Sequence, residues 1–273
     1  MDFDFSEEQN ALQELSSQIF EGSSSFDRVE LIEKSEKKFD ESLWNQLAEA
    51  NLLGVAIPEE FGGLGFGLFE LSILLEQHGR SVAPIPLLPT LAMGALPIIE
   101  FGSDEQKSQI LPKVTSGQCI LTGAFQEWGI NNPLNTSLNA ELIDSRWHLT
   151  GSKPAVPSAE NADYFVVSAQ TAEDQISLFL VTNPSKGITI TSSPTTNRER
   201  HSQIDLEQTE AELLGDLGQG MHAMVWILER VHTAIAAVAV GCCAKATEMM
   251  ADTLASGFLA EGKKVEAFAE RIA

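Results

Sequence analysis

"RWHLTGSK", residues 146–153, alternates apolar and polar side chains, the pattern of a β-strand with one buried face. More short segments follow, rich in β-branched or aromatic residues and separated by Gly, Pro, Asn and Asp: DYFVVSAQ (163–170), SLFLVTN (177–183) and ITITSS (188–193). Strands that follow one another without helices between them predict a small antiparallel barrel or sandwich. We place this β-domain at residues 118–216.

The sequence on both sides of this region has a helical period. Residues 1–117 predict helices with capping boxes at Ser6 and Ser103, and a long turn at IPEEFGGLGFG (57–67). LFELSILLEQHG (68–79) is expected to end at Gly79 as a C-cap. Residues 217–273 predict one long helix and the start of another, too little for a bundle. The fold class is therefore α+β, with an all-α N-terminal domain, the β-domain and an incomplete C-terminal helical domain. The chain is expected to be incomplete or to rely on another subunit, in a homo- or hetero-oligomer.

Composition excludes several classes of partner. Asp and Glu outnumber Lys and Arg 39 to 17, a net charge of −22, which argues against nucleic acid and anionic membranes. The apolar run TAIAAVAVGCCAKA (233–246) is too short to span a bilayer and predicts a buried helix. The acidic N-terminus lacks a signal-peptide pattern, and three cysteines, two of them adjacent, favour a reducing cytoplasm. No metal-binding spacing of Cys or His is present, so no metal site is expected.

The order of helices, β-domain and helices, together with local motifs, resembles the acyl-CoA dehydrogenase family. The segments that carry the resemblance are MDFDFSEEQNAL (1–12), IPEEFGGLGFGLFELSILLEQHGRSVAP (57–84), FGSDEQKSQILPKVTSGQ (101–118), WHLTGSKPAVPSAENADYFVV (147–167) and ELLGDLGQGMHAM (212–224). The resemblance implies FAD as cofactor, an acyl-CoA thioester as substrate and an electron-transfer flavoprotein as electron acceptor. A glutamate would remove the α-proton while the β-hydrogen leaves as hydride.

The family's T-E-P-x-x-G-S-D motif contacts flavin and acyl-CoA at the start of the β-domain. An alignment without gaps from LTGSK places Phe125 at its Thr, Gln126 at its Glu and Asn131 at its Ser. Gln126 or Asn131 can donate a hydrogen bond, whereas Phe125 cannot replace a hydroxyl. Trp128 stands where the family has a small residue, and we expect it to fill space meant for a ligand. Alternatively, the loop no longer contacts flavin at all.

The resemblance implies two further flavin contacts. In KPAVPS (153–158), Pro157 replaces the family's Thr and Ser158 lies beside it, while Lys153 is expected to be a solvated charge. The R-x-Q-F-G motif corresponds to LASGFLAEG (254–262), where its arginine position becomes Ala255 or Gly257. No arginine is therefore available there for the FAD pyrophosphate.

The catalytic base has two candidate positions. Matching the L-E-R sequence nominates Glu229, whereas counting from the preceding glycines places Val231 there, about 200° away around a helix. Glu229 can equally be a solvated acid beside Arg230. Two hypotheses follow: an acyl-CoA dehydrogenase subunit that takes part in α,β-dehydrogenation, or a non-catalytic subunit that scaffolds a hetero-oligomer with an intact homologue.

Overall fold

A computed structural model of the chain describes residues 4–254 except 174 and 194. The N-terminal part is helical, as expected. Its elements are α1 (Glu7–Ser23), α2 (Phe26–Lys34), α3 (Glu41–Glu49), the short turns η1 (Leu52–Gly54) and η2 (Glu59–Phe61), α4 (Leu68–Ser81), the π-helical η3 (Pro89–Ala95), α5 (Leu96–Phe101) and α6 (Asp104–Thr115). Both predicted capping boxes are present: Ser6 and Ser103 each accept from the backbone three residues on, and Gln9 and Gln106 bond back.

The middle of the chain forms the predicted β-domain. Its strands are β1 (Leu121–Ala124), β2 (Asn139–Ile143), β3 (Arg146–Pro157), β4 (Tyr164–Ala172), β5 (Gln175–Thr182), β6 (Ile188–Ser193) and β7 (His201–Leu214). They pair in the order β1-β4-β2-β3-β7-β5, with β6 beside β7. A further β4–β5 pairing closes β4, β2, β3, β7 and β5 into a barrel. The barrel is antiparallel except where β4 pairs with β1 and β2.

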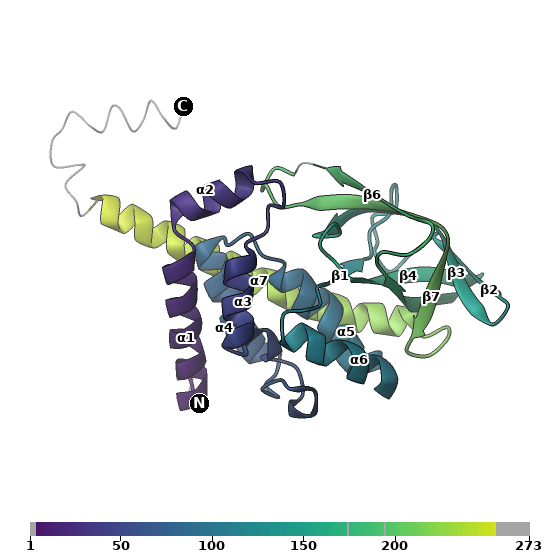
Figure 1. Ribbon diagram of the computed structural model, residues 1–273, viewed down its shortest axis with the longest axis horizontal. Coiled ribbons are helices and arrows are strands. Elements are labelled where there is room, and N and C mark those ends of the chain that lie inside the picture. The colour runs from purple at the N-terminus through teal and green to yellow at the C-terminus, as the bar shows by residue number, and fades with distance from the viewer. Residues whose placement is uncertain (1–3, 174, 194, 255–273) are drawn as a thin grey trace.

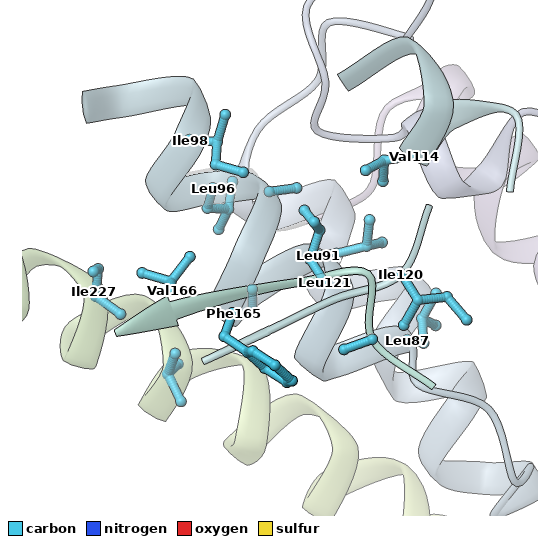
Figure 2. Packing of buried hydrophobic residues seen from close by; sticks show 14 of the residues in the cluster. Leu87, Leu91, Leu96, Ile98, Val114, Ile120, Leu121, Phe165, Val166 and Ile227 are labelled. Carbon is cyan, nitrogen blue, oxygen red and sulfur yellow. The ribbon is translucent and has the colours of Figure 1, made fainter. Parts of the chain in front are cut away.

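The barrel and the helices share one hydrophobic core. Helix α7 (Gly220–Thr253) runs under both parts, from the end of β7 to the far side of the N-terminal helices (Figure 1). Figure 2 shows Leu91 of η3 and Leu121 of β1 close to Phe165 and Val166 of β4, with Ile227 of α7 nearby. Packed side chains therefore join the barrel to the helices in this region. The predicted domain boundaries at 117/118 and 216/217 stay predictions.

The small residues of α7 have a specific packing role. A Cβ atom at Gly79 of α4 would come within 2.1 Å of the Val238 carbonyl oxygen, and one at Gly241 within 2.0 Å of the Glu76 oxygen. Helices α4 and α7 can pack this closely only because these positions have no side chain. Gly79 is thus not a C-cap: α4 continues to Ser81, and Val82 has the left-handed conformation at its end. The C-cap prediction was wrong because packing, not termination, requires this glycine.

Only one side of α7 is buried, whereas the apolar run predicted a buried helix. Val225, Ile235 and Val240 are exposed on one side, while Ile227 and Ala234 are in the core. The run is also part of a longer helix. By length and composition alone α7 would reach across a bilayer, as would many core helices of soluble proteins, and 28% of its most apolar window is buried.

Candidate functional site

A cavity of about 490 Å³ lies where the loop after β1, the end of β3, η3 and α7 meet. Phe125, Gln126 and Pro157, three of the predicted cofactor contacts, line it. Ala155 contributes from the same wall, and Val231 from α7. The two sequence stretches expected to hold a flavin therefore border one cavity, whose volume is in the range of ligand sites.

A second cavity of about 330 Å³ adjoins the first. Ser158 lines this second cavity, and His78, Glu199 and His201 line both. Glu199 Oε2 lies 3.5 Å from His201 Nε2, and this contact is the main cause of the lowered pKa of Glu199. His78 belongs to α4 and His201 begins β7, while Glu199 lies in the loop before β7, so no local sequence pattern connects the three. Asn131, the remaining predicted contact, is exposed and lines neither cavity.

Trp128 does not fill the ligand space, contrary to expectation. Its side chain is 73% exposed, and its Nε1 donates to Gln203 Oε1 of β7 at 3.2 Å. A tight turn joins Glu127 to Ile130 and carries Trp128 onto the outside of the barrel. The sequence showed a bulky residue in the loop, but its direction depends on this turn. Trp128 does not line the cavity.

Lys153 is the largest correction. It was expected to be a solvated charge, yet it is 0% exposed, and its Nζ donates to Glu127 Oε1 at 2.6 Å. The Glu127 carboxylate also accepts from the Ser137 backbone at 2.8 Å and from the Thr136 hydroxyl. Burial raises the pKa of Glu127, but hydrogen bonds from Lys153, Ser137 and Thr136 outweigh it and bring this pKa from 4.5 to about 2. Burial lowers the pKa of Lys153, and Glu127 opposes this effect. We take the carboxylate, with its many donors, to be ionised and to keep the ammonium charged.

This ion pair also suggests another alignment of the loop. A gap of one residue places Glu127, instead of Gln126, at the glutamate of T-E-P-x-x-G-S-D. Gln126 then takes the place of the threonine, and Trp128 that of the proline. We infer this register because Glu127 is the buried, bonded carboxylate of the loop, whereas Gln126 is exposed and lines the cavity.

The structure separates the two candidate base positions. Glu229 has a side chain 69% exposed, 3.5 Å from Arg230, and does not line the cavity. Arg230 in turn stacks on Trp226, with its guanidinium carbon 3.6 Å from the ring centroid. Val231, at 6% exposure, faces the cavity instead. A catalytic role for Glu229 stays a prediction. The exposed position of Glu229, outside the cavity, does not favour this role. The third predicted contact, at Ala255 or Gly257, lies outside the described residues.

Comparison with known proteins identifies the family. The family profile "Acyl-CoA dehydrogenase, N-terminal domain" matches residues 6–118. Acyl-CoA dehydrogenase FadE27 of Mycobacterium tuberculosis is 30% identical over 72% of this chain and 51% of its own length. The chain belongs to the acyl-CoA dehydrogenase family.

Solved acyl-CoA dehydrogenase structures have the same fold. A variant of the Tcur3481–Tcur3483 steroid ACAD is 40% identical, with a TM-score of 0.85 over 91% of this chain and 66% of that one. The ChsE4–ChsE5 complex from Mycobacterium tuberculosis is 27% identical, with a TM-score of 0.84 over 92% and 68%. The chain thus spans about half of the curated relative FadE27 and about two thirds of these solved chains.

The acyl-CoA dehydrogenase family is FAD-dependent, and the first cavity suits one part of that cofactor. Its walls are largely apolar, with Phe125, Val231 and Ile235, and the Gln126 amide can donate a hydrogen bond at the rim. Such a lining fits a flavin ring. No Lys or Arg lines this cavity among the described residues, whereas Lys38, Arg198 and Arg200 line the adjoining second cavity.

Proposed function

We propose that this chain is a subunit of an acyl-CoA dehydrogenase that carries out α,β-dehydrogenation of an acyl-CoA thioester. The observation that supports this most is the open cavity between the Phe125–Gln126 loop and the end of β3, the two stretches matched to flavin motifs. FAD, when bound, accepts the hydride. We expect an electron-transfer flavoprotein as electron acceptor and a cytoplasmic location.

The residues of this chain would bind and orient the ligands. The apolar wall of Phe125, Val231 and Ile235 would exclude water from the reacting carbons. The Gln126 amide is placed to hydrogen-bond a ring or carbonyl oxygen at the cavity edge. Glu199 is the one carboxylate among the described residues lining the first cavity, and it already contacts His201.

Because Glu229 does not line the cavity, we propose that the α-proton acceptor comes from outside the described residues. A second, homologous subunit would supply it in a hetero-oligomer. The names of the Tcur3481–Tcur3483 and ChsE4–ChsE5 relatives, each with two components, support this assembly. The second candidate function, a purely scaffolding subunit, rests on the same position of Glu229.

The test is flavin binding followed by reduction. The chain, alone and with an intact homologue, is titrated with FAD, and absorbance near roughly 450 nm is followed as an acyl-CoA is added without oxygen. Val231→Phe, which narrows the cavity, should weaken FAD binding or reduction. Glu229→Gln, two residues earlier and on the opposite side of α7, is the matched control and should leave both unchanged.

The outcomes separate the two candidates. Flavin that bleaches on addition of acyl-CoA, with loss in Val231→Phe, supports a dehydrogenase subunit. A complex whose FAD affinity and activity are unchanged by Val231→Phe would indicate that this cavity holds no flavin. The chain would then act only as a scaffold. Loss of reduction in Glu229→Gln would restore Glu229 as a candidate base.

A further inference from the structure

We propose that the buried Glu127–Lys153 ion pair positions the wall of the cavity. It fixes the Phe125–Gln126 loop relative to the end of β3. The proposal rests on the proposed function, since it assigns the pair a role at the same cavity. Neither residue lines the cavity, so both act through their neighbours.

The pair joins four separate segments inside the barrel. Lys153 belongs to β3, and its Nζ contacts Glu127 in the loop after β1 and the Ser168 hydroxyl of β4 at 3.2 Å. Glu127 reaches the segment before β2, where its Oε2 accepts from Ser137 N at 2.8 Å and from Ser137 Oγ at 2.6 Å. Its Oε1 accepts from Lys153 and from Thr136. Both ends of the loop are thus fixed at one carboxylate.

The neighbours of both residues form the cavity wall. Gln126 directly precedes Glu127, and Pro133 lies between Glu127 and its anchors before β2. On β3, Ala155 lines the cavity two residues after Lys153. The pairing of β3 with β7 shifts register after Lys153, and Ala155 has a φ of 54°, which turns the strand at this point. A displaced ion pair would therefore move both walls at once.

Apolar packing alone would fix this loop poorly. Gln126, Trp128, Asn131 and Asn132 are all exposed, and Phe125 is its only fully buried apolar side chain among residues 125–133. Directional hydrogen bonds to a buried carboxylate supply the position that packing does not.

The atomic arrangement makes Glu127→Gln a sharp perturbation. One carboxylate oxygen receives the Lys153 ammonium and the other the Ser137 amide, both of them donors. A glutamine NH₂ group must face one of these donors in either orientation. Glu127→Asp keeps two acceptor oxygens and the charge. Trp44→Phe is the control, since it removes a buried hydrogen bond, 3.0 Å to the Gly117 oxygen, in the helical region.

The experiment combines amide exchange with FAD titration. In Glu127→Gln, exchange at Ser137 and Leu138 should rise at least about tenfold, and FAD affinity should fall about tenfold or more, because a small displacement of a binding wall is costly. Glu127→Asp should restore part of both, and Trp44→Phe should change neither. If Glu127→Gln does not fold, Glu127→Asp carries the same measurements with smaller expected changes.

Unchanged exchange at Ser137, or faster exchange with wild-type FAD affinity, would overturn the positioning role. An equal loss of FAD affinity in Trp44→Phe would also overturn it, because the effect would then be one of stability alone. A wild-type chain that binds no FAD, alone or with a homologue, would refute the proposed function. The exchange arm would still decide whether the pair fixes the loop.

Discussion

Replacing Glu127 with glutamine should lower the free energy of unfolding by about 3–5 kcal/mol, the usual cost of leaving a buried charge without its partner. Lys153 is fully buried, so its ammonium would lose its counter-ion and have no water to replace it. The pKa of Glu127 is lowered because hydrogen bonds from Lys153, Ser137 and Thr136 outweigh the effect of burial, so the ionised carboxylate stabilises the fold. Typical domains have only about 5–15 kcal/mol of stability, so the loss is large.

A double-mutant cycle in urea would measure this coupling. Lys153→Met should cost a comparable amount, because Glu127 is then the unpaired charge. The double variant Glu127→Gln, Lys153→Met should lose less than the sum of the single changes, since no charge remains buried alone. A loss below about 1 kcal/mol for Glu127→Gln, or simple additivity in the cycle, would refute the view that the pair is buried and coupled.

The pH dependence has a defined sign. Glu127 has a folded pKa below its unfolded value of 4.5, so its contribution is present above that pH and is lost as pH falls toward about 2. The stability difference between wild type and Glu127→Gln should therefore shrink from about pH 7 to about pH 3. A difference that stays constant over this range would contradict an ionised, hydrogen-bonded carboxylate.

Three further outcomes follow from burial and packing. Trp128→Ala should change the free energy of unfolding by less than about 1 kcal/mol in urea and leave FAD affinity unchanged, because the side chain lies outside the cavity. Tighter FAD binding in this variant would mean that Trp128 does obstruct the site. Gly79→Ala should cost about 1–3 kcal/mol, because its Cβ would strike the α7 backbone, whereas Gly22→Ala, with open space around it, should be neutral or stabilising in the same assay. Burial raises the pKa of the Cys119 thiol to about 12, so a thiol reagent at about pH 8 should label exposed Cys243 well before Cys119, and mass spectrometry of the labelled peptides would reveal the reverse order.

The fold class was predictable because the sequence signals for its elements are local. Alternation in RWHLTGSK gave β3, and Ser–Gln pairs gave the starts of α1 and α6. Gly79 was wrongly predicted to be a C-cap. A glycine is required there because α4 packs against the backbone of Val238, which is far away in the chain. The motif resemblance pointed to the two segments that border the candidate cavity. It did not predict the hydrogen bonds that hold these segments in place. The burial of Lys153 depends on Glu127, and no periodicity connects two residues from different strands and loops.

The loop around Trp128 shows how substitutions in the family motifs affect the cavity and its hydrogen-bond donors. Because Trp128 lies on the outer surface, the substitutions leave the cavity open and act on hydrogen bonding. In the register inferred above, the Gln126 amide stands at the motif's threonine, and Pro157 places carbon where the motif has a hydroxyl. No Lys or Arg lines the first cavity among the described residues. A weak affinity for FAD would then reflect missing donors, which a second subunit can supply. A blocked cavity could not be rescued in this way, so recovery of FAD binding on adding the homologue separates the two explanations.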